Sequence, residues 1–280
     1  SGLFLSSSKE DCTTVKGKPS PFNISFLRSD VLANTTLLFD NNVLYAHNIL
    51  FQKENVHKIG LFTLVYVKFR YHLDLLNRRV VLASTSERRK EILNGLGFPF
   101  TVVQSSFDED KNRPDTSDPK EFTQWTASQK ALAAVEDLKN HCNPPDFVIG
   151  ADTVVFLDEV ILGKPTDSEH AVEMLKILSG KVHSVVTGLS IHYKSQSGYK
   201  ERLTSEVTRV KMATLNDLII NSYVESGESL GKAGSYGIQG LGGSLIEAID
   251  GDYYNVVGFP LHRFTTEMIS IIQESNEPHS

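Results

Sequence analysis

From Arg79 onward, short apolar runs alternate with segments of helical periodicity, and this alternation constrains the fold more than any other feature of the sequence. Residues 80–83, 100–103 and 147–149 are strand candidates, because each is a short apolar run between polar or turn residues. Helical patterns separate and follow these runs, so the sequence predicts an α/β protein.

The helical patterns come with recognisable ends. Ser86 is a candidate N-cap for the first helix, which Gly95 and Gly97 would end. Thr166 and Glu169 have the spacing of a capping box ahead of a later helix. The long helix between these two would present one apolar face, formed by Phe122, Trp125, Leu132, Val135 and Leu138.

Two further patterns predict antiparallel pairing. Residues 154–162 are typical of a hairpin that turns at Asp158 and Glu159. Residues 184–193 and 206–212 are typical of two long strands joined by a Ser/Gly-rich turn. The sheet is therefore expected to be mixed, with flanking helices.

The chain changes character near residue 78. Residues 1–77 hold eight Lys or Arg against six Asp or Glu, and they carry no motif. We interpret them as an N-terminal extension of unassigned role: a poorly ordered segment, a small addition to the main domain, or an artefact of gene modelling. Residues 78–275 form the predicted domain, and residues 276–280 a tail.

Charge and hydropathy argue against several classes of protein. A net charge of −6 and a pI near 5.9 argue against nucleic acid as a partner, whereas one local cluster of cations would suffice for a small polyanion. The apolar segment 61–76 is interrupted by Lys68, Arg70 and Asp74, so no membrane span is predicted. Two cysteines and no recognisable signal peptide indicate a cytoplasmic protein.

The first candidate site lies where the strand at 80–83 gives way to a helix. Ser84 and Ser86 precede Arg88 and Arg89 there, and hydroxyl and guanidinium groups at a helix N-terminus form a cradle for phosphate. Cations in a first helical turn oppose the helix dipole, so the arrangement costs stability unless an anion binds. The alternative is an ordinary capped helix with solvated arginines.

Asp152 and Thr153 follow the third strand candidate, which we expect to end at Gly150. A carboxylate at the carboxyl end of a sheet strand lies where open α/β sheets bind ligands. Asp152 is therefore a candidate general base, or a candidate ligand of a divalent metal. The alternative is an Asp that caps a turn.

Lysines and carboxylates outside these two stretches are also candidates. Lys130 and Lys164 are candidate phosphate-binding cations, although an isolated Lys is more often a surface residue. Asp108, Glu109 and Asp110 form an acidic group that could hold Mg²⁺, and the alternative is a solvated acidic loop.

Residues 231–243 contain six glycines, which permit close approach of the backbone to a ligand. Within this stretch, Gln239 offers both a donor and an acceptor to the edge of a base. The alternative is a flexible loop, which the apolar and aromatic residues between the glycines disfavour.

Taken in order, these blocks resemble the Maf family of nucleoside triphosphate pyrophosphatases over about residues 79–264. A single short block is weak evidence, but several in family order are specific. The resemblance rests on 82–89 (LASTSERR), 150–153 (GADT), 163–165 (GKP), 178–188 (LSGKVHSVVTG), 232–240 (KAGSYGIQG) and 251–260 (GDYYNVVGFP).

The resemblance implies an elongated α/β fold of the Maf/ITPase type with a central cleft, often in a homodimer. It implies hydrolysis of a nucleoside triphosphate to the monophosphate and pyrophosphate, with Mg²⁺ or Mn²⁺. Asp152 would be the general base, Lys164 would assist catalysis while binding phosphate, and Asp108 or Glu109 would hold the metal together with Asp152. The remaining phosphate-binding groups would be Ser84, Ser86, Arg88, Arg89 and Lys130.

The resemblance also bears on the substrate. Arg88, Thr153 and Gln239 match the subgroup that prefers dTTP and UTP, which leaves modified pyrimidine nucleotides as further candidates. The other main subgroup acts on 7-methyl-GTP and differs at these positions. Glu87 replaces a usual Pro and Gly231 a usual Asp, and these two departures favour the alternative of a non-catalytic nucleotide-binding regulator.

Overall fold

The computed structural model describes residues 36–40, 43–47, 75–109, 111–112 and 114–276. The chain divides into two units, Ser1–Lys68 and Phe69–Ser280. In the first unit, β1 (Thr36–Asp40) and β2 (Val43–His47) form an antiparallel hairpin. Most of the predicted N-terminal extension lies outside the described residues. So does the predicted tail, apart from its first residue. The domain boundaries therefore stay a prediction.

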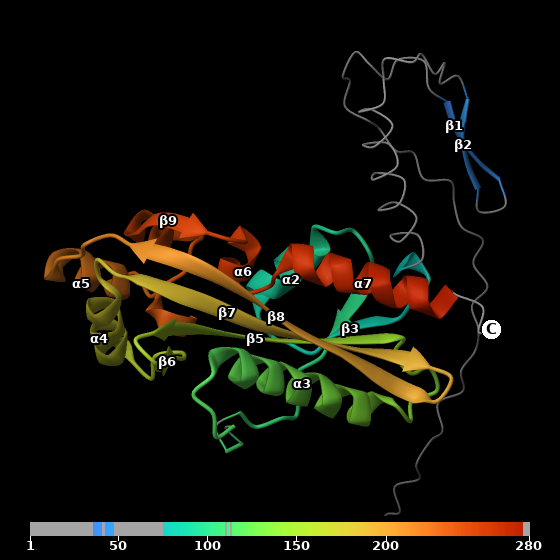
Figure 1. Cartoon of the computed structure of the whole chain (residues 1–280), viewed down its shortest axis with the longest axis horizontal. Coiled ribbons are helices and arrows are strands. Elements are labelled where there is room, and N and C mark those ends of the chain that lie inside the picture. Colours follow the sequence, from blue (N-terminus) through green and yellow to red (C-terminus); the bar gives the residue numbers. More distant parts are fainter. Residues whose placement is uncertain (1–35, 41–42, 48–74, 110, 113, 277–280) are drawn as a thin grey trace, which may run out of the picture. The chain divides into compact units, whose positions relative to one another are not determined.

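The second unit contains a seven-stranded mixed sheet (Figure 1), which confirms the predicted α/β class. The strand order is β4-β3-β5-β7-β8-β9, and β6 pairs with β5. β3 is parallel to β4 and β5, and the other pairs are antiparallel. The strands are β3 (Val80–Leu82), β4 (Phe100–Val102), β5 (Phe147–Leu157), β6 (Val160–Leu162), β7 (Val182–Ser195), β8 (Gly198–Met212) and β9 (Ile246–Asp250).

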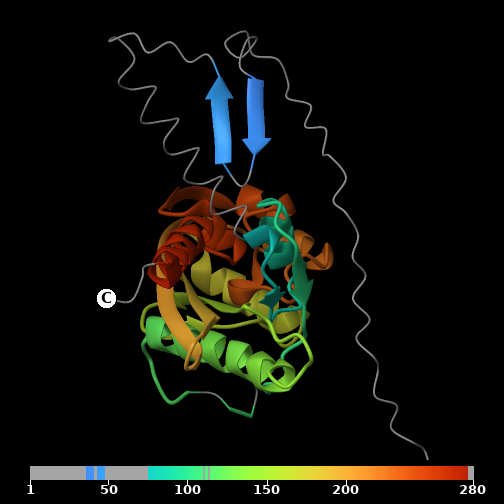
Figure 2. The same ribbon diagram turned by 90° about the vertical axis from the view of Figure 1, so that its right-hand side faces the viewer.

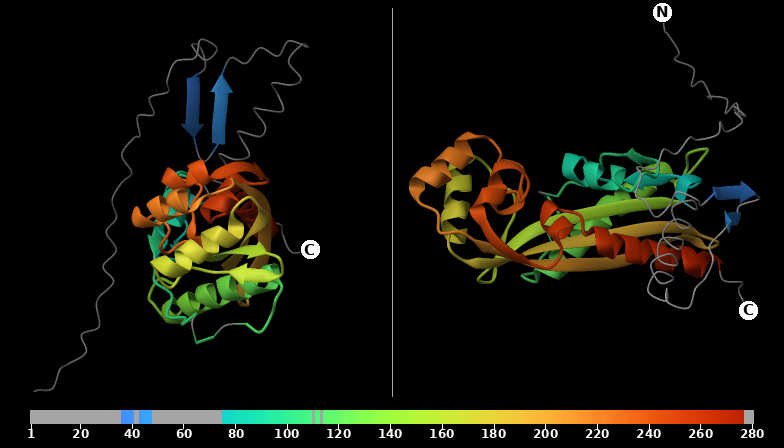
Figure 3. Two further views of the ribbon diagram at one scale, coloured as in Figure 1. Left: turned by 90° about the vertical axis from the view of Figure 1, so that its left-hand side faces the viewer. Right: turned by 90° about the horizontal axis from the view of Figure 1, so that it is seen from above.

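Helices cover both faces of this sheet. Figure 2 shows α3 on one face and α7 on the other. α4 and α5 lie together at one end of the long strands β7 and β8, and α2 lies toward the other end (Figure 3). The helices are α2 (Glu87–Asn94), α3 (Pro119–Leu138), α4 (Ser168–Leu178), α5 (Asp217–Glu225), α6 (Tyr253–Val257) and α7 (Leu261–Asn276), with 3-10 turns at Ala233–Ser235 and Gly240–Leu245.

Two apolar cores share one face of the sheet, and β5 contributes to both. Phe147, Ile149 and Ala151 belong to the core that includes side chains of α2 and α7. Val155 and Leu157 belong to the core that includes side chains of α4 and α5. Successive side chains of a strand alternate between faces, so Thr153 is the polar position that interrupts this apolar row.

The face of α3 that packs on the sheet differs from the predicted apolar face. Its buried residues are Thr123, Thr126, Ala127, Lys130, Ala131, Ala134 and Val135. Of the predicted apolar face, Val135 is buried and Leu138 packs against the core beneath α3, whereas Leu132 is 39% exposed. The reason is a close approach of helix and sheet: a Cβ at Gly150 would lie 2.2 Å from the Ala127 carbonyl oxygen. Large side chains have no space at that point of the interface.

Other predicted boundaries also shift. The strand expected to end at Gly150 continues to Leu157, because β7 pairs with it along almost its whole length. The capping box at Thr166 and Glu169 does not form. Instead, Asp167 is the N-cap of α4.

The hairpin after β5 forms as predicted. Asp158 and Glu159 connect β5 to β6, with φ values of 49° and 66° that suit a tight two-residue turn. Among the described residues, no helix is both long enough and apolar enough to cross a bilayer.

Candidate active site

The candidate site lies where one edge of β5 has no neighbouring strand. β3 pairs with this edge as far as Ile149, and β6 pairs with it from Val155 onward. Over the described part of the chain, residues 150–154 therefore have a strand partner only on the β7 side. Side chains from both faces of β5 can reach a ligand through this gap, which explains why Asp152 and Thr153 belong to one site despite pointing to opposite faces.

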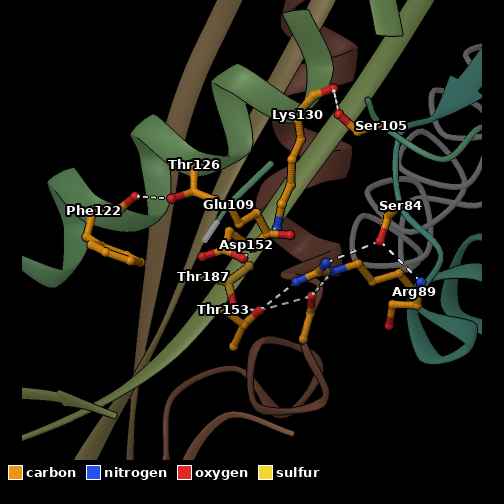
Figure 4. A network of polar contacts seen from close by, with 12 residues as sticks. Ser84, Arg89, Ser105, Glu109, Phe122, Thr126, Lys130, Asp152, Thr153 and Thr187 are labelled. Carbon is orange, nitrogen blue, oxygen red and sulfur yellow. Dashed lines mark hydrogen bonds and ion pairs between the residues drawn. The ribbon is translucent and has the colours of Figure 1, made fainter. Parts of the chain in front are cut away.

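Lys130 is buried and joins two carboxylates on the α3 face of the sheet (Figure 4). Its Nζ lies 2.8 Å from Asp152 Oδ1 and 2.8 Å from Glu109 Oε2. A buried ammonium is costly unless it is paired, and the two carboxylates supply that pairing. The geometry thus holds a cation between two anions at the edge of the gap.

Glu109 reaches this cluster because its loop is attached to α3. Ser105 Oγ donates a hydrogen bond of 2.9 Å to the Lys130 carbonyl oxygen. The ring of Phe107 packs edge-on against Trp125, with centroids 5.5 Å apart. This explains why Trp125, predicted as a core residue, instead supports the loop.

Arg89 organises the opposite side of the gap. Its Nε donates to the Gly258 carbonyl oxygen at 2.8 Å, Nη1 to Ser84 Oγ at 3.2 Å and Nη2 to Thr153 Oγ1 at 3.0 Å. Burial lowers the pKa of Arg89, and the nearby Asp152 carboxylate opposes that shift. Arg89 therefore holds β3, β5 and the end of α6 together, while placing a positive charge beside Asp152.

Thr153 connects Arg89 to β7. Its Oγ1 lies 3.0 Å from Oγ1 of Thr187, the residue directly opposite on that strand. Thr187 also donates to the Asn255 carbonyl oxygen at 3.3 Å. The two threonines thus form a polar floor between the two apolar cores.

Three further cations face the same space with few polar contacts. The Arg88 guanidinium makes one hydrogen bond within the described chain, from Nε to the Val257 carbonyl oxygen at 3.2 Å. Lys164 is exposed and has no polar partner among the residues that the structure places. Lys232 Nζ donates to the Glu228 carbonyl oxygen. These side chains are available to an anionic ligand.

A cleft of about 710 Å³ brings the predicted residues together. It is lined by Ser84, Ser86, Arg88, Arg89, Glu109, Lys130, Asp152, Thr153, Lys164 and Gln239. Asp108 is not in this lining, and its carboxylate pairs with Lys111 Nζ at 2.7 Å. Asp110 lies outside the described residues. Ser86 occupies the N-cap of α2, but its side chain makes no capping bond within the described chain.

The cleft also contains residues to which sequence reasoning assigned no role. Gln104, Glu228, Lys232 and Tyr236 all line it. Lys232 and Tyr236 stand inside the glycine-rich stretch, so their position was a usable signal. Gln104 and Glu228 lie in polar segments without a motif, and only the fold brings them here.

The cleft has a donor set compatible with Mg²⁺ or Mn²⁺. Among the described residues, no group of three or more His, Cys, Asp or Glu side chains could hold a metal ion. Mg²⁺ commonly needs only one or two carboxylates, together with waters and substrate phosphates. Glu109 and Asp152, held on one ammonium, fit that requirement.

An open mixed sheet with an interrupted edge and a cation-lined cleft defines an α/β protein suited to a small polyanionic ligand. Residues 79–271 match the family described as Maf-like protein, and the chain belongs to this family. The resemblance inferred from the sequence blocks is thereby confirmed.

Curated proteins from distant organisms are similar to this chain. A human protein named probable bifunctional dTTP/UTP pyrophosphatase/methyltransferase protein is 45% identical over 202 residues, which is 70% of this chain and 32% of the human one. The dTTP/UTP pyrophosphatase of Bacillus pumilus is 45% identical over 183 residues, covering 65% and 91% of the two chains. That of Clostridium novyi is 43% identical over 185 residues, covering 66% and 93%. The chain thus spans about a third of the human relative and most of each bacterial one.

Proposed function

We propose that this protein hydrolyses dTTP and UTP to the monophosphate and pyrophosphate. The observation that carries the proposal is the cluster of Asp152, Lys130, Glu109 and Arg89 at the open edge of β5, inside a cleft lined by further cations. The names of the bacterial and human relatives support the choice of substrate.

Asp152 is the proposed general base. It lies at the gap in β5, where water and substrate can reach it, and Lys130 fixes its Oδ1 from the α3 side. A base must be within hydrogen-bonding reach of the water that it activates. An anchored carboxylate at an open strand edge meets that need and would orient water toward the α-phosphorus.

The distribution of charge favours a triphosphate. The inner cluster is balanced, because Lys130 and Arg89 stand against Asp152 and Glu109. Arg88, Lys164 and Lys232 add an outer group of cations. The two other carboxylates in the lining are engaged elsewhere, Glu87 with Lys90 and Glu228 with two backbone amides. The charge that develops on the phosphates in the transition state is stabilised by such preorganised cations.

The two positions at which the sequence differs from the usual family pattern, Glu87 and Gly231, hardly change this balance of charges in the cleft. The Glu87 side chain is 74% exposed and lies 3.4 Å from Lys90 Nζ, which offsets its charge. Gly231 has a φ of 71°, a conformation that glycine adopts without strain, and open space surrounds its Cβ position. These observations favour the enzyme over the non-catalytic alternative.

We also propose that Mg²⁺ or Mn²⁺ is required, with Glu109 and Asp152 as its protein ligands. Such an ion, when bound, would neutralise phosphate charge and polarise the reacting phosphoryl group. Arg88, Lys164 and Lys232 would bind the remaining phosphate oxygens, and Ser84 and Ser86 would donate hydrogen bonds to them.

The test is pyrophosphate release from dTTP, UTP, CTP, GTP and 7-methyl-GTP by the wild type and by Asp152→Asn. We expect turnover of dTTP and UTP, with kcat lowered about 10²–10⁴-fold in the variant. The triphosphate should still bind to the variant, because Arg88, Lys164, Lys232 and the second metal ligand, Glu109, are retained. Asp158→Asn is the matched control, because Asp158 lies in the exposed β5–β6 turn. If the wild type hydrolysed 7-methyl-GTP alone, the assignment of dTTP and UTP as substrates would be wrong. If the wild type bound triphosphates without hydrolysing any of them, the non-catalytic regulator would be the better description.

A further inference from the structure

The segment 237–242, here called the Gln239 loop, lines the cleft with its residues 237–240 and is fastened by the carboxylate of Glu228, which also lines the cleft. Glu228 Oε2 accepts a hydrogen bond from the Leu241 amide at 2.9 Å. Its Oε1 accepts one from the Gly242 amide, also at 2.9 Å. Hydrogen bonds from amides to an ionised carboxylate are stronger than those between neutral groups, so Glu228 is a firm anchor for this end of the loop.

Tyr223, on α5, fastens the other end of the Gln239 loop. Its Oη accepts a hydrogen bond from the Gly237 amide at 3.3 Å and donates one to Glu228 Oε1 at 3.2 Å. The Tyr223 side chain is buried in the core beneath α5, which fixes the position of its hydroxyl. Gln239 therefore stands between two anchored points that are themselves hydrogen-bonded to each other.

The packing leaves the Gln239 loop little freedom. A Cβ at Gly240, where φ is 67°, would lie 2.6 Å from Glu228 Oε2. A Cβ at Gly242 would lie 2.3 Å from the Gly237 carbonyl oxygen and 2.7 Å from Tyr223 Oη. The glycines are thus required by close contact with the two anchors, rather than by flexibility.

The charge state of the anchors suits this role. Partial burial acts to raise the pKa of Glu228, but hydrogen bonds from the Gly242 and Leu241 amides and from Tyr223 outweigh it, so this pKa lies below its usual value. Burial raises the pKa of Tyr223, so its hydroxyl keeps its proton. At neutral pH the pair is a carboxylate acceptor and a hydroxyl donor.

We infer that Glu228 and Tyr223 are positioning residues that set the protein's discrimination among nucleobases, by fixing Gln239 at the cleft wall. This inference rests on the proposed function, in which a pyrimidine nucleoside triphosphate occupies the cleft. Of the proposed phosphate-binding cations, Arg88 and Lys164 belong to other elements, and Lys232 donates to the main-chain carbonyl of Glu228, a group that a change of the Glu228 or Tyr223 side chain leaves in place. The Gln239 loop instead contributes backbone groups and one side-chain amide, whose donor and acceptor suit the edge of a base.

The variants Glu228→Gln and Tyr223→Phe test this inference. The first keeps the shape of the side chain but replaces one acceptor oxygen with an NH₂ group that faces backbone amides. The second removes only the hydroxyl. Glu225→Gln is the matched control, since Glu225 is an exposed carboxylate at the end of the same helix.

The readout is the ratio of dissociation constants for UTP and CTP, measured on the full chain carrying Asp152→Asn so that hydrolysis is slow compared with binding. We expect each anchor variant to reduce the preference for UTP by about tenfold, the equivalent of one hydrogen bond to the base. The Glu225→Gln control should leave the ratio unchanged. Affinity for inorganic tripolyphosphate should stay within about twofold of the parent in the Tyr223→Phe variant, because the phosphate-binding groups are not altered.

Two alternatives give different results. If Glu228 acted only through its charge, its removal would strengthen binding of every triphosphate alike and leave the ratio constant. If the variants merely loosened the fold, tripolyphosphate affinity would fall in step with UTP affinity. Either result would overturn the inference. Hydrolysis by the wild type is measured separately, so failure of the proposed reaction is distinguishable from failure of this positioning role.

The double variant adds a further check. Because Tyr223 and Glu228 are hydrogen-bonded and fasten the same loop, the effect of removing both should be smaller than the product of the two single effects. Fully multiplicative effects would show that the two residues act independently and would contradict a joint anchor.

Discussion

His183 is a buried residue whose protonation is opposed by its surroundings. It lies on β7 and is 2% exposed, and its Nε2 is 2.6 Å from Tyr236 Oη. Its Nδ1 is buried without a hydrogen-bond partner within the described chain. Burial lowers the pKa of His183 to about 4. Since Tyr236 lines the cleft, this histidine supports the wall while staying neutral.

We expect His183 to make stability fall as the pH is lowered below about 6.5. The unfolded state has the higher pKa and takes up the proton first, so stability is fully present above 6.5 and is lost toward pH 4. Between pH 7 and pH 5 the free energy of unfolding should fall by about 2 kcal/mol from this residue alone. Urea unfolding at both pH values measures it.

His183→Phe is the variant that isolates this effect. It should be less stable than the wild type at pH 7 by about 1–3 kcal/mol, because the Tyr236 hydroxyl loses its partner. Its loss of stability between pH 7 and pH 5 should be smaller than that of the wild type by about 2 kcal/mol. An identical pH dependence in the two proteins would contradict the assignment to His183.

At the scale of elements, the contact between α3 and the sheet positions Lys130 against Asp152. Gly150→Ala would place a Cβ 2.2 Å from the Ala127 carbonyl oxygen, which is backbone and has little room to move. We expect a loss of about 1–3 kcal/mol in the free energy of unfolding, because the helix must shift away from the strand. Hydrolytic activity should fall as well, since that shift separates Lys130 from Asp152.

The control is Gly163→Ala, a glycine whose Cβ position has no atom within 4 Å in the described structure. We expect its stability to stay within about 0.5 kcal/mol of the wild type. Equal destabilisation in both variants, measured by chemical unfolding, would rule out the close helix–sheet contact as the cause.

The same contact shows why part of the fold could be predicted and part could not. Strand cores such as residues 80–82 and the hairpin turn at Asp158 and Glu159 are local signals, and both formed as predicted. The buried face of α3 was mispredicted, because its small residues are selected by Gly150 and Gly188 on strands distant in sequence. Apolar periodicity does not reveal such a partner.

Local competition explains the misplaced cap of α4. Thr166 and Glu169 fit a capping box, but Asp167 Oδ1 accepts from the His170 amide at 2.8 Å. An ionised Asp is a stronger N-cap than Thr, and its charge interacts favourably with the helix dipole. The first half of β8 was missed as well: the sequence predicted a strand over 206–212, whereas β8 begins at Gly198. Many side chains in that half are polar and exposed, so they do not form an apolar run.

The site was easier to predict than the details of the fold, because the candidate catalytic and phosphate-binding residues lie in short sequence motifs. The sequence indicated Asp152, Arg89 and Lys130 individually, and the structure brings all three into one cleft. What the sequence could not supply was the gap in pairing along β5. That gap depends on where β3 ends and β6 begins, which is a property of the assembled sheet.

At the scale of the whole second unit, the cleft lies between two apolar cores that β5 and β7 connect. Thr153 and Thr187 interrupt the apolar rows of these strands at the boundary between the cores. Arg88 and Arg89 come from α2 beside the first core, whereas Lys232 and Tyr236 lie beside the second. A triphosphate that contacts both groups would therefore connect the two cores, and its binding should stabilise the fold as a whole.

We expect this stabilisation to require the nucleotide and the divalent ion together. With Asp152→Asn, which prevents turnover but retains Glu109, UTP at 100 times its dissociation constant should contribute about 2.7 kcal/mol. For a unit of this size that raises the melting temperature by about 5–10 °C. Thermal unfolding with and without UTP and Mg²⁺ measures the shift.

Mg²⁺ alone should leave the melting temperature of the wild type unchanged, and so should a chelator. The reason is that the described residues contain no group of three or more metal-ligating side chains, and Lys130 together with Arg89 already balances the charge of the two carboxylates at the gap. The ion then binds strongly only when phosphate oxygens complete its coordination. A melting temperature that rises with Mg²⁺ alone would instead show a preformed metal site. The ion would then bind to the free protein and stabilise its structure, rather than bind only together with the substrate.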